Sequence, residues 1–264
     1  MDAPAGLKYL LGEKVITLKS KDEIEKIRRA GQVVAETILH VAGSVKPGAT
    51  TLDLDRIAEE FIVSKGMIPA FKGMYGFRHT LCLSINEEVV HGIPSNKRVL
   101  KEGDILGVDC GAVFEGFYGD SARTIPCGTV SPEVQRLIEV TRESLNRGIE
   151  QMHPNKRLYD IGAAVQAHAE GAGFKVVKEY VGHGIGRALH EDPQVPNYGT
   201  PGTGMRLKTG MVLAIEPMVN IGGEETYILD DGWTVVTKDG SYSAHFEDTI
   251  AITENGPEIL TRLE

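Results

Sequence analysis

Apolar residues recur at helical spacing in four stretches of the chain. The first stretch follows Ser20, which together with Glu23 forms a capping box, and its apolar positions continue to Gly43. The same spacing predicts helices over about 51–66, from Ser131 to about Met152, and over about 158–171. Two helices therefore precede each of two regions in which β-type patterns prevail.

Strands are predicted where apolar runs are short and rich in β-branched residues. These runs cover 80–85, 104–114, 117–126, 211–220, 234–237 and 248–253. Turn sequences such as Glu115-Gly116 and Asp230-Asp231-Gly232 favour antiparallel hairpins over parallel βαβ units. We therefore predict an α+β fold in which helices cover one face of a curved antiparallel sheet.

Part of the sequence occurs twice, at an offset of 107. The decapeptide 100–109 resembles 207–216, and each copy ends an apolar run in a carboxylate, Asp109 in the first and Glu216 in the second. A carboxylate at the end of a buried strand is costly unless it is paired or binds a metal. The repeat predicts two related halves that share one site. The expected organisation is one catalytic domain over 1–264 with an internal duplication, about 20–127 and 131–253, after an N-terminal extension, 1–19.

Composition and charge narrow the class of protein. The 264 residues are 41% hydrophobic and 25% charged, which is ordinary for a folded domain, and the net charge of −9 argues against binding to a phosphate backbone. Cys82, Cys110 and Cys127 form no C-x-x-C pair, which fits a reducing compartment. No apolar run is long enough to span a membrane. We expect a cytoplasmic monomer that binds neither nucleic acid nor a membrane, with an organellar protein that has lost its transit segment as the alternative.

Four carboxylates and one histidine stand in contexts typical of a metal site. Asp109 and Asp120 lie on strands joined by a tight turn, and glycines on both sides of His183 are expected to leave its imidazole accessible. Glu216 precedes Pro217, and Glu247 follows a short apolar segment. Each residue alone is more often a solvated or capping group. Together they suit divalent Mn, Fe, Co or Zn, and four carboxylates balance two such ions, a pair that can activate water for hydrolysis.

Several motifs resemble those of the type I methionine aminopeptidases. They are His91-Gly92-Ile93-Pro94, Asp109-x-Gly111 with Asp120, Gly182 to Gly186 followed by His190-Glu191-Asp192-Pro193, Ala214-Ile215-Glu216-Pro217 and Phe246-Glu247. The resemblance covers about residues 24–258. It implies a pita-bread fold with two pseudo-symmetric halves, a site for two divalent metal ions, and removal of the initiator methionine from nascent chains when the second residue is small. The implied partners are the N-termini of nascent polypeptides near the ribosome.

The resemblance also implies roles for single residues. Asp109, Asp120, His183, Glu216 and Glu247 would ligate the metals, with Asp120 and Glu247 bridging and Glu216 also taking the proton of the attacking water. His91 and His190 would be histidines that do not bind metal. His91 would contact the substrate amine or leaving nitrogen, and His190 the scissile carbonyl. His245, beside a ligand segment, is interpreted as a neighbour and not as a ligand.

For the methionine side chain the resemblance implies an apolar cup. Its residues would be Phe71, Phe77, Cys82 and Trp233, with His91 at the edge. Phe71 stands where bacterial relatives often carry cysteine, and Phe77 where tyrosine is common, so a hydroxyl hydrogen bond is absent; Cys82 has the alternative of a buried strand cysteine. Asn86, Glu88 and Ser243 resemble the family's site for one monovalent cation.

Two other functions remain open on the same scaffold. An X-Pro aminopeptidase or prolidase-like peptidase would cleave next to proline and carry additional N-terminal architecture. A metal-free binding protein would have lost ligands, whereas all five positions are filled here. The sequence does not distinguish among Mn, Fe, Co and Zn.

Overall fold

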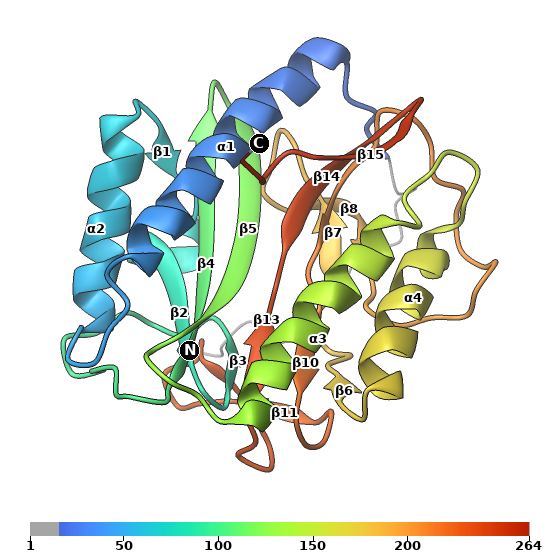
Figure 1. Ribbon diagram of the computed structural model, residues 1–264. Coiled ribbons are helices and arrows are strands. Elements are labelled where there is room, and N and C mark those ends of the chain that lie inside the picture. The colour runs from blue at the N-terminus through green and yellow to red at the C-terminus, as the bar shows by residue number, and fades with distance from the viewer. Residues whose placement is uncertain (1–15, 264) are drawn as a thin grey trace.

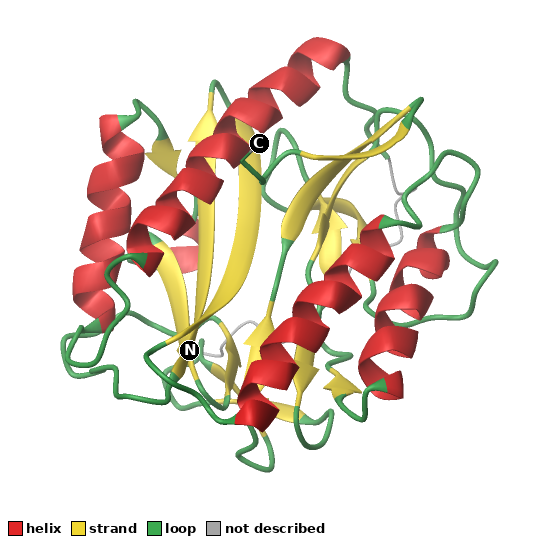
Figure 2. Cartoon of the chain, viewed as in Figure 1, coloured by secondary structure: helices red, strands yellow, loops and turns green. Residues whose placement is uncertain are grey.

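The computed structural model describes residues 16–263, in which four long helices lie against antiparallel strands (Figures 1 and 2). The helices are α1 (Lys21–Ala42), α2 (Thr51–Ser64), α3 (Pro132–Ile149) and α4 (Leu158–Gly171), and a short 3₁₀ turn, η1, covers Met74–Gly76. All four predicted helices are present. Among the described helices none is both long and apolar enough to cross a membrane.

Local signals explain where the helices begin. The Ser20 hydroxyl accepts a hydrogen bond from the Glu23 backbone N–H, and the Glu23 carboxylate accepts one from the Ser20 N–H, so the predicted capping box is confirmed. The Ser131 hydroxyl accepts a hydrogen bond from the Val134 backbone N–H and so caps α3, without a reciprocal bond. α2 and α4 begin at Thr51 and Leu158, which repeats the sequence offset of 107.

The strands of the described residues fall into four sheets, and every pairing is antiparallel. One sheet contains β1 (Ile68–Pro69), β4 (Ile105–Phe114), β2 (Leu81–Ile85) and β5 (Phe117–Pro126). The largest sheet contains β15 (Gly256–Ile259), β14 (Asp248–Thr253), β9 (Val212–Ile215), β7 (Gly182–Gly184) and β8 (Glu191–Val195). The two small sheets contain β13 (Ser243–His245), β10 (Met218–Asn220) and β6 (Lys175–Val176), and β11 (Thr226–Ile228), β12 (Val235–Thr237) and β3 (Glu88–Val90). The predicted α+β class is confirmed.

The β-type stretch predicted over 211–220 contains two strands. β9 ends at Ile215, and β10 begins at Met218 in a different sheet. Pro217 has no N–H to continue a ladder, so the chain leaves one sheet and enters another at this point. The change of sheet leaves Glu216 outside both strands. Eight strands of two to five residues were not predicted, because segments this short carry no measurable periodicity.

Each pair of helices covers one face of its own strands (Figure 1). On one side α1 and α2 bury residues such as Val34 and Leu54 against Leu106 of β4; on the other, α3 and α4 bury Leu145 and Ile161 against β9 and β14. These fully buried side chains stabilise each half through the hydrophobic effect. The strand faces that the helices leave uncovered are available for a site between the halves.

Part of the predicted N-terminal extension belongs to this body. Lys19 is buried, forms an ion pair with Glu191, and donates its backbone N–H to the Gly210 carbonyl at 2.7 Å. Ile16 packs against the core of the second half. Residues 1–15 of the extension lie outside the described residues.

Candidate metal centre

Two carboxylates come from the hairpin formed by β4 and β5. Its turn residues, Glu115 and Gly116, both have positive φ (47° and 80°), as a two-residue turn of the primed type requires. In the resulting register Asp109 faces Ala122, and Gly111 faces Asp120. Directly opposed residues share a face, as do residues two apart on one strand. Asp109 and Asp120 are therefore diagonal neighbours on one face, although eleven positions separate them.

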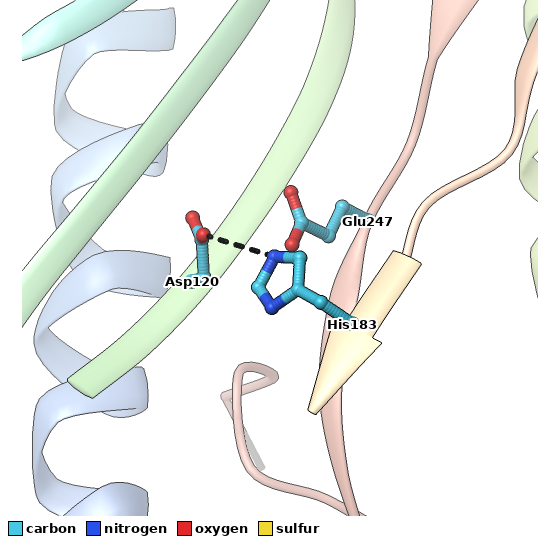
Figure 3. Close-up of side chains that lie close together, drawn as sticks. All are labelled: Asp120, His183 and Glu247. Atoms are coloured by element: carbon cyan, nitrogen blue, oxygen red, sulfur yellow. Dashed lines mark ion pairs between the residues drawn. The ribbon is translucent and has the colours of Figure 1, made fainter. Parts of the chain in front are cut away.

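The second half supplies the other three groups. His183 lies on β7, between Ala214 of β9 and Gln194 of β8, Glu216 follows β9, and Glu247 lies between β13 and β14. Ligand atoms of Asp120, His183 and Glu247 lie within 4.8 Å of one another (Figure 3). His183 Nε2 lies 3.6 Å from Glu216 Oε1 and 4.0 Å from Asp120 Oδ2. All five predicted ligand residues line one cavity.

The charges of this cluster are not balanced by basic side chains. In the described part of the chain no lysine or arginine forms an ion pair with Asp109, Asp120, Glu216 or Glu247. Burial raises the pKa of Asp109 to about 7; burial and then repulsion among the carboxylates raise the pKa values of the other three well above their usual range. One buried oxygen atom on each of Asp109, Asp120 and Glu247 has no hydrogen-bond partner among the described residues. Divalent cations would satisfy both the charge and the unpaired oxygens.

His183 is only 8% exposed to solvent, but its side chain lines both cavities of the site. The neighbouring glycines serve close strand packing. A Cβ on Gly182 would lie 2.3 Å from the Ala214 carbonyl oxygen, and one on Gly184 2.3 Å from the Asp192 carbonyl oxygen. His183 Nδ1 lies 3.0 Å from the Gly184 carbonyl, which favours the tautomer whose Nε2 lone pair faces the carboxylates. Burial lowers the pKa of His183 to about 3, so the ring is neutral and its Nε2 lone pair is free to bind a cation.

The two histidines predicted not to bind metal stand beside this cluster. The rings of His183 and His190 meet edge to face with centroids 4.5 Å apart, and the ring of His91 meets that of Tyr180 at 5.9 Å. Burial, with a smaller contribution from His190, lowers the pKa of His91 to about 4, and partial desolvation lowers the pKa of His190, which stays exposed at the edge of the cavity. Both rings are therefore neutral at pH 7 and can donate or accept a hydrogen bond.

An apolar cup opens from the carboxylate cluster, in a cavity of about 220 Å³. Phe71, Phe77, Cys82 and Trp233 all line it, and the rings of Phe77 and Trp233 lie 5.1 Å apart. The pKa of the buried Cys82 thiol is raised well above its usual range, first by burial, so it is a neutral, apolar wall. Three lining residues were not predicted: Met74, Tyr75 and Leu189. Only Leu189 had a sequence signal, its place directly before His190.

A second cavity, of about 340 Å³, adjoins the same cluster from another side. Tyr180, Gln194 and His245 line it together with His91 and Glu216. The carboxylates thus lie between an apolar cup and a more polar space. This arrangement suits a substrate whose first side chain enters the cup while the rest of the molecule extends away.

Two of the three residues predicted to hold a monovalent cation, Asn86 and Ser243, are in contact. The Ser243 backbone N–H donates to the Asn86 carbonyl at 2.9 Å, and the Ser243 hydroxyl is buried without a partner. The Glu88 carboxylate is engaged by Arg98 and by the Ile85 N–H. The cation site stays a prediction.

Comparisons with known proteins agree with this geometry. Residues 25–254 match the profile of metallopeptidase family M24. A methionine aminopeptidase of Clostridium perfringens is 52% identical over 250 residues, which are 95% of this chain and 100% of that protein. The crystal structure of a methionine aminopeptidase from Thermotoga maritima matches with a TM-score of 0.93 and 49% identity, over 94% of this chain and 100% of that one. A prolidase from Pyrococcus furiosus matches with a TM-score of 0.76 and 25% identity, over 94% of this chain and 66% of that one.

Proposed function

Because this chain belongs to metallopeptidase family M24, a family with the pita-bread fold, we propose that it is a methionine aminopeptidase, which removes the N-terminal methionine of proteins whose second residue is small. One observation carries the proposal: an apolar cup lies directly beside a cluster of two buried and two half-buried carboxylates and a neutral histidine. The cup can hold the first side chain of a peptide, and the cluster can hold the ions that hydrolysis of its first peptide bond requires.

We infer that Asp109, Asp120, His183, Glu216 and Glu247 hold two divalent ions, with Asp120 and Glu247 shared between them. The unpaired oxygens of Asp109, Asp120 and Glu247 fit this role. When bound, such ions lower the pKa of water and polarise a carbonyl group. The donor set of oxygens and one nitrogen suits Mn, Fe, Co or Zn, and the identity of the ions is part of what the experiment below tests.

The remaining chemistry falls to side chains of this chain. Glu216 accepts the proton of the attacking water, because burial makes its carboxylate a stronger base than an exposed one. His190 donates a hydrogen bond to the scissile carbonyl oxygen as negative charge develops there. His91 contacts the substrate amine or the leaving nitrogen. Both histidines are neutral, so each can serve as a hydrogen-bond donor without adding charge that would repel the metal ions.

Specificity follows from the shape of the cup. Phe71, Phe77 and Trp233 provide apolar walls at one end of the cavity, which suit a long, unbranched and flexible side chain such as that of methionine. A charged side chain would lose its hydration there without gaining a partner. A small second residue lets the peptide bond approach the carboxylate cluster.

The setting of the reaction forms part of the proposal. We expect the substrates to be N-termini of nascent polypeptides near the ribosome and the enzyme to act as a monomer in the cytoplasm, where the three buried cysteines, all free, would stay reduced. A monovalent cation held by Asn86, Glu88 and Ser243 is proposed as a structural element.

The alternatives are less well supported. The prolidase matches with a lower TM-score than the methionine aminopeptidase and extends well beyond the length that this chain covers. A metal-free binding protein would have no need of four clustered carboxylates for which the described residues provide no basic partner.

Metal titration and a peptide series test the proposed function together. The demetallated protein is titrated with Mn, Fe, Co and Zn while release of methionine from a Met-Ala-Ser peptide is measured. Activity should return with at least one of these metals, and peptides beginning Met-Ala and Met-Gly should be cut in preference to those beginning Met-Asp and Met-Lys. Comparable cleavage of peptides beginning with Leu, Lys and Met would leave a general aminopeptidase, and preferred cleavage before proline would favour the prolidase-like alternative.

A further inference from the structure

His245 has a buried ring nitrogen for which the described residues provide no hydrogen-bond partner. The residue is 4% exposed and lies at the end of β13, two positions before Glu247. Its Nε2 lies 3.9 Å from Glu216 Oε2 and 4.0 Å from Glu247 Oε2. Both distances exceed hydrogen-bond length by less than one ångström, so small rotations of the two carboxylates would close them.

The position of the His245 ring is set by its backbone. Its N–H donates to the Thr124 hydroxyl at 2.9 Å, and that hydroxyl donates in turn to the His245 carbonyl at 3.0 Å. The residue also pairs with Met218 of β10. These contacts fix the backbone from which the His245 ring projects toward Glu216 and Glu247.

Glu216 lies between two imidazoles. His183 Nε2 lies 3.6 Å from its Oε1, and His245 Nε2 lies 3.9 Å from its Oε2. The two histidines differ in their relation to the other ligands. His183 lines the cavity that all five predicted ligands share, whereas His245 lines the second cavity, beside Glu216. The two imidazoles therefore approach Glu216 from different sides.

We propose that His245 is a positioning residue of the metal centre: its Nε2–H donates to the carboxylates of Glu216 and Glu247 and holds both in the orientation that binds the divalent ions. The hydrogen bond satisfies an otherwise unpaired buried donor, whose desolvation is costly. Groups that hydrogen-bond to metal ligands in this way commonly tune metal affinity. The inference rests on the proposed function, because it needs the ions to be present.

Metal affinity in two substituted proteins tests this role. His245→Ala removes the donor, and His245→Gln places an amide N–H in a side chain of similar reach. His40→Gln is the matched control, since His40 is exposed on α1. Each demetallated protein is titrated with Mn²⁺ by calorimetry, and its thermal unfolding is recorded without metal. We expect His245→Ala to weaken binding by about 10 to 100-fold at unchanged stoichiometry, and His245→Gln to restore most of that loss.

Other outcomes would overturn the proposal, each in its own way. Unchanged affinity in His245→Ala would show that the ring does not act on the metal centre. A drop in the number of bound ions in both variants would identify His245 as a direct ligand. If each variant loses metal affinity in proportion to the thermal stability that it loses without metal, His245 is an ordinary core residue. If the unsubstituted protein itself binds no metal, the proposed function fails, and this inference fails with it.

Discussion

The ring of Phe71 lies directly against Gly111. A Cβ atom built on Gly111 would come within 2.8 Å of Phe71 Cε1 and 2.9 Å of the Ala70 Cβ. Gly111 pairs with Asp120 across the hairpin, so the aromatic wall of the cup is held one strand away from a predicted metal ligand. Absence of a side chain at this position is what lets the cup and the carboxylates lie side by side.

Gly111→Ala should therefore impair the cup while leaving the metal ligands in place. The added methyl group would force Phe71 toward the cavity, and such overpacking typically costs about 1–3 kcal/mol of stability. We expect a higher KM for Met-Ala-Ser with metal content unchanged. Gly107→Ala on the same strand is the matched control, because its Cβ would meet Ser84 at an ordinary 3.5 Å. Equal KM values in the two variants would contradict the assignment of Phe71 to the cup.

Asp109→Asn should abolish metal-dependent peptidase activity. The change keeps the shape of the side chain but removes a charge that the divalent ions need, and even loss of groups behind the ligands costs about 10 to 100-fold in affinity or activity. Activity at saturating metal and calorimetric binding measure the effect. Asp22→Asn, at an exposed site in the first turn of α1, provides the control. More than about a tenth of the original activity at saturating metal would exclude Asp109 as a ligand.

His190→Ala should lower kcat by about 100 to 1,000-fold, as removal of a donor to a developing oxyanion does. Metal content should stay unchanged, because His190 contacts the ring of His183 and is not proposed as a ligand. Single-turnover kinetics and metal analysis of the same preparation measure both quantities. A variant that loses its metals would show that His190 has been assigned to the wrong role.

The metal-free protein should lose stability as the pH rises. Burial raises the pKa of Asp109 from 3.8 to about 7, so the folded state binds its proton more tightly than the unfolded state. The contribution of protonated Asp109 to the free energy of unfolding is fully present below about pH 4 and is lost as the pH rises through about 7. Asp109→Asn mimics the protonated acid, so the metal-free variant should gain in Tm relative to the unsubstituted protein across this interval. A pH-independent difference in Tm would contradict the raised pKa.

Asp55→Ala should destabilise the first half. The buried Asp55 carboxylate accepts hydrogen bonds from the backbone N–H groups of Thr80 and Leu81 at 2.9 and 2.8 Å, and lies 3.2 Å from His79 Nδ1. Without the carboxylate, the two backbone N–H groups lose their acceptor, which costs about 1–3 kcal/mol of stability for each. Denaturant unfolding measures the loss. Asp55→Asn keeps an acceptor oxygen and should cost less; equal losses would show that the carboxylate bonds are not the cause.

Helices and hairpins were predictable because their determinants are local. The capping box of Ser20 and Glu23 and the apolar periodicity of α1 act within a few residues, and the turn at Glu115-Gly116 sets which face Asp109 and Asp120 share. The family to which the chain belongs also followed from motifs that are contiguous in sequence, and the comparisons confirm it.

By itself, then, the sequence determined the helices, the principal hairpin, the family and the residue types of the site, since each depends on neighbours along the chain. Tertiary structure decided the rest. The placement of β9 and β10 in different sheets, the burial of His183 and the unpaired nitrogen of His245 all depend on which distant segments pack together. A short strand such as β7 gains its hydrogen bonds from partners far away in sequence, and no local pattern records which partners those are.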